Sequence, residues 1–215
     1  MSGPAVVRAG DTITVSFVAG GGILGGSGSV SYDASKLTLK GYTQIIGGSW
    51  AVEFSGDNFV FYDNSMASPI NGSTTIFTAT FTVNTGLATG TAISVTASGV
   101  TLSDGQSDTG AGSPTYSATI AAPLSDNCNL AKLNVTNASI SPAFSPDVLE
   151  YSASVPYSVS SLDLTAAAEH PGAKVTIDNP GLAEAATTRV QVSVTAENGA
   201  VNTPSPICLY GAASG

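Results

Sequence analysis

The sequence predicts an all-β protein made of two tandem antiparallel β-sandwiches. Apolar and polar residues alternate in short runs such as 11–19 (DTITVSFVA) and 189–196 (RVQVSVTA), which is the period of a half-buried strand. The 215 residues include 24 Gly and 11 Pro, and only 10% are charged, a composition typical of extracellular β modules. No apolar stripe of helical spacing is sustained, so long helices are not expected.

The first module is expected at residues 4–121. The segment Ser55-Gly56-Asp57-Asn58 is typical of a tight hairpin between two aromatic-rich strands. Many short strands at regular spacing predict a sandwich or a barrel. The strand-bearing segments are expected, in order, at 11–19, 26–42, 49–65, 74–83, 91–100 and 114–121.

A short polar linker containing Pro123 is expected at residues 122–127, and a second module at 128–213. Pro204 and Pro206 each remove a backbone donor, so the last strand of this module is expected to be short or to lie at a sheet edge. The strands of the second module are expected at 131–136, 150–155, 161–168, 173–179, 188–198 and 205–211.

The charge pattern excludes two classes of partner. The net charge is -9, and the six basic residues are scattered along the chain. A surface that follows phosphates needs clustered Lys and Arg, so neither nucleic acid nor anionic lipid is an expected partner. No apolar run approaches the roughly 20 residues that span a bilayer, so membrane insertion is not expected. Residues 1–11 lack the apolar core of a signal peptide, and we interpret Met1-Ser2-Gly3 as replacing a removed leader.

The first module resembles the cohesin family of jelly-roll sandwiches. The matching segments are 7–17 (VRAGDTITVSF), 22–39 (GILGGSGSVSYDASKLTL) and 77–83 (FTATFTV). The resemblance implies a non-catalytic recognition domain whose partner is a dockerin. The family has a Tyr-Asp element after its second long strand, here Tyr32-Asp33. Dockerin-binding cohesins commonly carry Asn and Asp on the strand before this element, whereas this chain has Gly and Ser at 25–29. We therefore expect that a typical type I dockerin does not bind.

The second module resembles the bacterial cadherin-like β-sandwich family. The segment 129–157 contains Ser141-Pro142-Ala143-Phe144 followed by Tyr151, which is similar to the family's "LxPxF…Y" signature. The run 192–199 (VSVTAENG) is similar to the strand that precedes the last one in this family. The resemblance implies an immunoglobulin-like sandwich on a surface protein and names no ligand.

The two cysteines, Cys128 and Cys208, fall at the expected first and last strands of the second module, which are neighbours in many sandwiches. An even cysteine count in an exported protein favours a disulfide bond between them. The alternative is two buried thiols.

Catalysis is not expected. His170 is the only histidine, and neither a G-x-S-x-G motif nor a zinc-ligand cluster is present. No cofactor is expected. Calcium near Asp104 and Asp108, or near Asp63 and Asn64, is an open alternative to the ordinary use of these residues in turns.

The candidate ligand-binding residues are Gly25, Ser27, Ser29, Trp50 and Tyr62. The small residues of 25–29 predict a flat strip that suits an extended ligand or an added strand. An outward-facing Trp50 or Tyr62 would offer a stacking platform or a partner anchor, and the alternative is that Trp50 fills the core.

Together these patterns favour a non-catalytic adhesion or scaffolding module, secreted or attached to the cell surface, that binds a surface protein or a polysaccharide. Two alternatives stay open. One is a carbohydrate-binding module that targets an attached glycoside hydrolase, and the other is a structural stalk segment.

Overall fold

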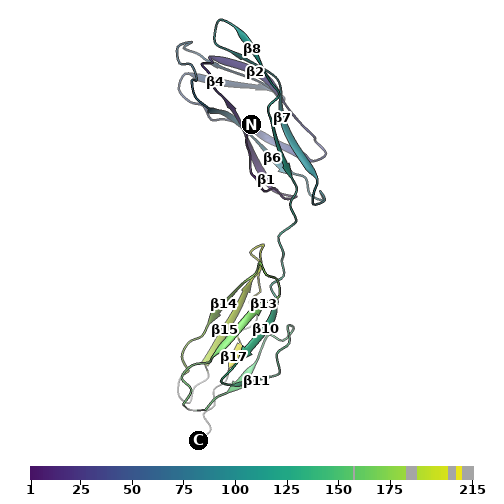
Figure 1. Ribbon diagram of the computed structural model, residues 1–215, viewed down its shortest axis with the longest axis vertical. Helices are drawn as coiled ribbons and strands as arrows, with labels where there is room; N and C mark the ends of the chain where they lie inside the picture. Colours follow the sequence, from purple (N-terminus) through teal and green to yellow (C-terminus); the bar gives the residue numbers. More distant parts are fainter. Residues whose placement is uncertain (157, 183–187, 203–206, 210–215) are drawn as a thin grey trace. The chain divides into compact units, whose positions relative to one another are not determined.

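The structure is a computed structural model that describes residues 1–156, 158–182, 188–202 and 207–209. It divides into two compact units, Met1–Pro123 and Leu124–Gly215, each built of antiparallel strands (Figure 1). No helix occurs in the described residues, and none therefore spans a membrane. The predicted all-β class is confirmed.

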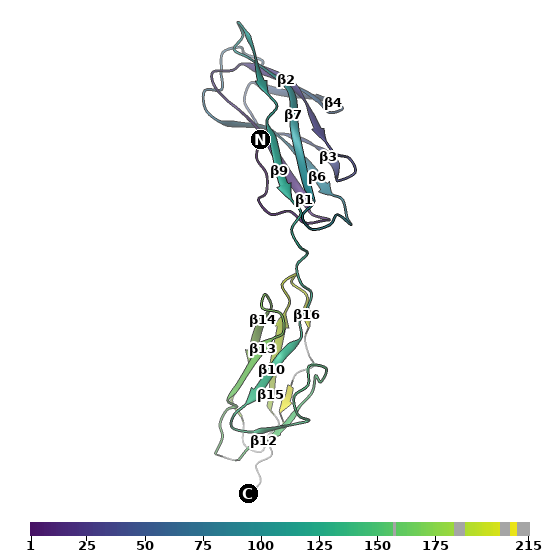
Figure 2. The ribbon, with the colours of Figure 1, turned by 45° about the vertical axis from the view of Figure 1, so that its right-hand side comes forward.

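The first unit is a sandwich of two sheets (Figure 2). One sheet has the order β1-β6-β3, and the other has the order β4-β5-β2-β7-β8, with β9 also pairing with β7. The strands are β1 (Thr12–Ala19), β2 (Gly25–Tyr32), β3 (Leu37–Gln44), β4 (Trp50–Ser55), β5 (Asn58–Asp63), β6 (Thr74–Val83), β7 (Ala92–Ser103), β8 (Asp108–Gly112) and β9 (Thr115–Thr119).

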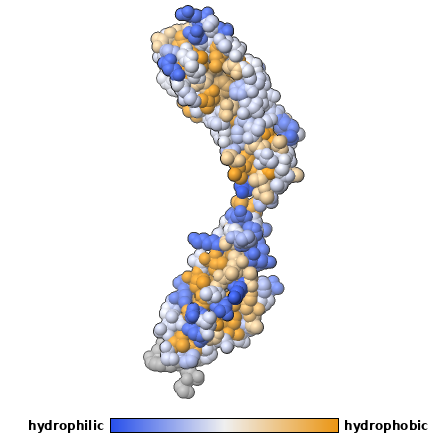
Figure 3. Space-filling view, in the orientation of Figure 1, coloured by the Kyte–Doolittle hydropathy of each residue, from blue (hydrophilic) through white to orange (hydrophobic). Residues whose placement is uncertain are grey.

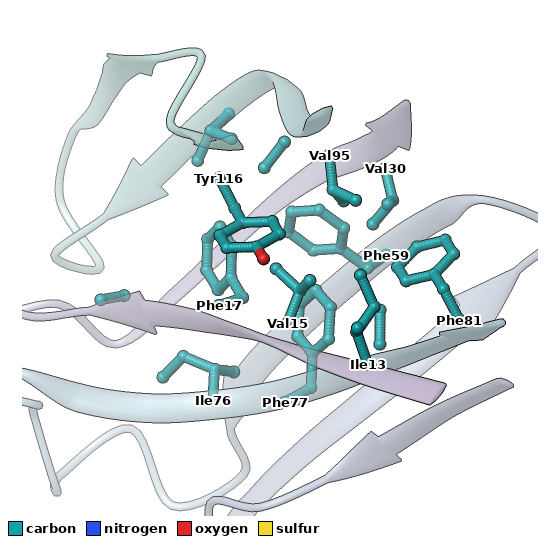
Figure 4. Close-up of a cluster of buried hydrophobic side chains, with 14 of the residues drawn as sticks. Ile13, Val15, Phe17, Val30, Phe59, Ile76, Phe77, Phe81, Val95 and Tyr116 are labelled. Carbon is teal, nitrogen blue, oxygen red and sulfur yellow. The ribbon is translucent and has the colours of Figure 1, made fainter. Parts of the chain in front are cut away.

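The core of the first unit is rich in phenylalanine (Figure 4). Phe17 from β1 stacks on Phe77 from β6 with ring centroids 5.1 Å apart, and it also contacts Phe59 from β5 at 5.0 Å. These rings come from both sheets, so they fasten the two layers together. Burying one such side chain stabilises the fold by about 1.5–3 kcal/mol.

A register shift in the first sheet explains two consecutive buried residues in β6. Ile76 and Phe77 are both fully buried, although neighbouring residues of a regular strand face opposite sides. The pairing of β1 with β6 shifts between Phe17 and Val18, so Ile76 is passed over in the ladder. Such an irregularity turns an extra side chain toward the core.

The second unit contains β10 to β17. Its core gathers Leu133, Tyr151 and the alternate residues Val190, Val192 and Val194. The pairs are β10 with β13, β11 with β12, and β15 with β14, β16 and β17. The strands are β10 (Leu130–Val135), β11 (Ser139–Ser141), β12 (Ser152–Ser154), β13 (Leu164–Ala168), β14 (Lys174–Asp178), β15 (Thr188–Thr195), β16 (Val201–Asn202) and β17 (Ile207–Leu209).

Part of the segment expected to be a linker contacts the second unit. The Ser125 carbonyl accepts a hydrogen bond from Asn198 N at 3.0 Å, and Asn127 Nδ2 donates to Glu169 at 3.2 Å. Before this segment, Ala121 N donates to Val7 O at 2.8 Å within the first unit.

The cysteine pair stays a prediction. Cys128 is half-buried, precedes β10 and has no disulfide partner among the described side chains. Cys208 lies in β17, paired through the backbone with Arg189, and its side chain lies outside the described residues.

Candidate binding face

The small residues of β2 divide between two sides of the sheet. A Cβ atom on Gly26 would lie 2.7 Å from the Phe61 ring, and one on Gly28 would lie 2.8 Å from the Phe59 ring. These glycines therefore face the core. Since neighbouring residues of a strand face opposite sides, Gly25, Ser27 and Ser29 lie on the side away from the core, where Gly25 is buried and the two serines are half-buried.

Strand register places residues of four strands beside this outward strip. One row runs from Tyr62 (β5) through Gly25 (β2) and Ser103 (β7) to Asp108 (β8). The next row runs through Val60, Ser27, Thr101 and Gly110, with Glu53 of β4 opposite Val60. We call this surface the outer face, defined by Glu53, Val60, Tyr62, Gly25, Ser27, Ser29, Thr101, Ser103 and Asp108.

A pocket of about 280 Å³ opens on the outer face. Its lining includes small residues of β2 and a residue of the turn between β7 and β8. It also includes two strongly exposed apolar side chains, Val60, which is 46% exposed, and Met66, which is 59% exposed. Figure 3 shows that apolar and polar residues are interspersed on the visible side of the first unit. The pocket is lined by Leu24, Gly25, Gly26, Ser27, Val60, Phe61, Tyr62, Met66, Thr101, Ser103, Gly105 and Asp108.

Tyr62 is held in place on this surface. Its hydroxyl donates a 2.6 Å hydrogen bond to Glu53 Oε1. This bond to the carboxylate raises the pKa of Tyr62 above its usual value, because the neutral phenol is the donor. The ring is therefore a fixed wall of the pocket, and its hydroxyl is already engaged.

Trp50 does not belong to the outer face. It is 8% exposed and stacks on Phe61 in the core with ring centroids 6.1 Å apart. Its indole Nε1 donates to Ser68 O at 3.2 Å. Of the five candidate ligand residues, Gly25, Ser27 and Tyr62 line one pocket, Ser29 lies further along β2 on the same face, and Trp50 faces the opposite side.

A buried carboxylate organises the loop beside the pocket. Asp63 is 1% exposed, and its oxygens accept hydrogen bonds from Ser65 Oγ at 2.7 Å, Ala67 N at 2.9 Å and Ser68 N at 2.7 Å. Burial by itself raises the pKa of Asp63, but the hydrogen bonds from Ser49, Ser65, Ser68 and Ala67 outweigh it. The pKa therefore lies well below its usual range.

The other sequence candidates have local roles. Asp104 accepts hydrogen bonds from Gln106 N at 2.8 Å and Ser107 N at 2.7 Å, which lower the pKa of Asp104 and shape its turn. His170 Nδ1 accepts from Gly172 N at 3.1 Å. Within the described parts of the chain, no three His, Cys, Asp or Glu side chains gather as metal ligands.

The residues of this site that the sequence analysis does not identify include Glu53, Val60 and Met66. Val60 alternates with the buried Phe59 and Phe61, so its outward position is readable from strand periodicity. Met66 follows an Asp-Asn-Ser turn signal, but nothing in the sequence brings that turn to the outer face.

Family comparisons divide the chain at the same place as its fold. The model for the cohesin domain matches residues 6–120. The model for the cadherin-like β-sandwich domain matches residues 130–205. Comparison with curated protein sequences gives no match.

Solved structures with a similar fold include three cohesins from Clostridium species. CaCohA2 from Clostridium acetobutylicum is 22% identical, with 56% of this chain and 88% of that chain covered and a TM-score of 0.46. The cohesin module of a family 33 glycoside hydrolase from Clostridium perfringens is 10% identical, with 56% of this chain and 93% of that chain covered and a TM-score of 0.47. A chain of a type I cohesin–dockerin complex from Clostridium thermocellum is 14% identical, with 55% of this chain and 95% of that chain covered and a TM-score of 0.44.

Proposed function

This chain belongs to the cohesin family, and on that premise we propose that its first unit is a non-catalytic module that binds a protein partner on the outer face. The observation that carries the proposal is the 280 Å³ pocket on that face, with the exposed apolar side chains of Val60 and Met66 at its rim. Exposed apolar groups gathered around a hollow and rimmed by polar residues are typical of interaction sites.

A protein suits this surface better than a polysaccharide. Sugar rings stack on exposed aromatic side chains, and Tyr62 is the only aromatic residue of β2, β4, β5, β7 and β8 that faces outward. Its hydroxyl is bound to Glu53, and Trp50 is buried. A flat row of stacking rings is therefore not available on these strands.

The partner is expected to differ from a typical type I dockerin. On the outer face, β2 presents the half-buried hydroxyls of Ser27 and Ser29 in place of amide and carboxylate groups, and Gly25 is buried. Hydrogen bonds to carboxylates are stronger than those to hydroxyls. A dockerin helix that binds through hydrogen bonds to carboxylates on this strand therefore lacks its main anchors here.

The second unit is proposed to be a spacer that presents the first on a secreted or cell-surface protein. It matches a cadherin-like β-sandwich domain. The low charged fraction and the cysteine pair support an extracellular setting. A pocket near Cys128 and Phe144 has a volume of about 20 Å³ and is too small for a ligand.

The test is calorimetry of the full chain against dockerins of several types, with pull-downs on cellulose, xylan and mucin. We expect a protein ligand whose binding is abolished by Ser27→Trp, which fills the outer face. Thr14→Trp is the matched control, because Thr14 is an exposed residue of the other sheet. Retention on a polysaccharide, with no protein ligand sensitive to Ser27→Trp, would favour the carbohydrate-binding alternative.

A further inference from the structure

The loop from Asp63 to Ser68 holds an apolar side chain out in solvent. Met66 has a φ of 52°, a left-handed conformation that non-glycine residues rarely adopt, and it is 59% exposed. Its N–H donates to Asp63 O at 3.1 Å. The Asp63 carboxylate fixes the following amides, and the Trp50 indole fastens the Ser68 carbonyl. The loop therefore presents Met66 in one preset position.

The pocket beside Met66 is lined in part by small residues. Gly25, Gly26 and Ser27 line it together with the larger side chains of Tyr62 and Met66. At one end the Met66 Cε lies 3.5 Å from the place that a Cβ on Gly105 would occupy. The volume of about 280 Å³ is near the lower limit of ligand pockets, about 300 Å³, which suits one side chain and its backbone.

The charges around the pocket have one sign. Glu53 and Asp108 are exposed and lie on opposite sides of β5 and β2 in the sheet order. None of the strands β2, β4, β5, β7 and β8 carries Lys or Arg. The three basic residues of the first unit lie elsewhere. Arg8 binds Ala122 O, Lys36 pairs with Asp33 and binds Ala92 O, and Lys40 is in β3 of the other sheet.

From these observations we infer that the pocket takes an aliphatic side chain of the protein partner, and that Glu53 and Asp108 select a Lys or Arg beside it. The inference rests on the proposed function and specifies the partner's chemistry. Methionine adapts its shape to the group that it contacts, which suits the rim of such a pocket. Opposite charges around a small apolar anchor give specificity and faster association.

The experiment pans a phage-displayed library of random dodecapeptides on the immobilised full chain. We expect the retained peptides to share an aliphatic residue within two positions of a Lys or Arg. Synthetic copies should lose binding to the Ser27→Trp chain and keep it with Thr14→Trp. They should bind about tenfold more weakly to Met66→Gly, which removes the side chain but accepts the left-handed backbone.

The charge requirement is tested by a double-mutant cycle. Asp108→Asn should weaken the binding of a peptide that carries Arg, and it should leave the binding of the Arg→Gln version of that peptide unchanged. Two results would separate the hypotheses. In the first, peptides fail to bind the Ser27→Trp chain and yet lack the aliphatic–basic pair, or bind the Met66→Gly chain as well as the wild type. Either observation would overturn this inference and leave the proposed function standing. Peptides indifferent to Ser27→Trp, or no retained peptide at all, would overturn both.

Discussion

The ring of Phe61 lies against the backbone of Gly26: a Cβ atom at Gly26 would be 2.7 Å from Phe61 Cζ and 2.8 Å from the Thr101 carbonyl oxygen. The glycines of strand β2 therefore allow large rings to pack directly beneath the outer face. The strip that shapes the binding surface and the core beneath it depend on the same short strand.

Gly26→Ala should destabilise the first unit by about 1–3 kcal/mol, because the backbone of Thr101 cannot move aside as a flexible side chain would. Urea unfolding followed by tryptophan fluorescence measures this, since Trp50 lies in the same core. Gly110→Ala is the matched control. Gly110 lies in β8 of the same sheet with nothing within 4 Å of a new Cβ. Equal effects of the two substitutions would contradict the steric explanation.

Asp63→Asn should lower the melting temperature of the first unit at neutral pH. An amide cannot accept all the hydrogen bonds that the carboxylate accepts from Ser65, Ala67 and Ser68. The pKa of Asp63 is lowered on folding, so its contribution is complete above the ordinary aspartate pKa of about 3.9. The contribution is lost as the pH falls toward the lower pKa of the folded state.

The difference in melting temperature between wild type and Asp63→Asn should therefore be constant above about pH 5 and shrink below about pH 4. Scanning calorimetry across this range measures it. Asp147→Asn, at an exposed residue of the second unit, serves as the control. A difference that stays constant down to about pH 2 would show that Asp63 acts without its charge.

Much of the first unit is readable from local pattern. The alternation of 11–19 corresponds to β1, and Ser55-Gly56-Asp57-Asn58 joins β4 to β5 as predicted. Strand β8 (Asp108–Gly112) escaped prediction, because it contains no large apolar residue and every residue in it is exposed. It is a strand because β7 offers it a backbone ladder, which is a tertiary cause that a local pattern does not carry.

The candidate site was predictable on β2 and β5 but not beyond them. Strand periodicity is sufficient to place Ser27 and Tyr62 on one side, once each strand is assigned to a sheet. Trp50 was ambiguous because either face of β4 could have been the core. Met66 reaches the pocket through the hydrogen bonds of Asp63, which join residues whose meeting depends on the folded loop.

The cysteine pair gives a prediction for the second unit. If Cys128 and Cys208 are bonded, the intact mass falls by two hydrogens. Closing a loop of about 80 residues would stabilise the unit by roughly 4 kcal/mol in the chain-entropy model. Reduction should then lower the melting temperature of the wild type and leave that of Cys128→Ser unchanged. Quantitative labelling of both thiols in the native protein would rule the bond out.

The last prediction concerns Tyr151 in the second unit. Its ring is 3% exposed and lies near Phe144, with centroids 6.3 Å apart. Its hydroxyl donates to Ser145 O at 2.8 Å and accepts from Ser145 N at 3.1 Å. The Tyr151 hydroxyl therefore contacts both backbone groups of Ser145, which lies in the turn between β11 and β12.

Tyr151→Phe should cost about 1–3 kcal/mol of stability, because the packing is kept while the Ser145 N–H loses its acceptor and the Ser145 carbonyl keeps only the hydrogen bond from Val148 N at 3.0 Å. Hydrogen exchange should show faster exchange of the Ser145 amide, with the protection of β1 to β9 unchanged. Tyr62→Phe is the control, since the Tyr62–Glu53 hydrogen bond is exposed to solvent and its loss should barely change stability. If Tyr151→Phe melts at the wild-type temperature, water has replaced the hydroxyl and the turn does not depend on it.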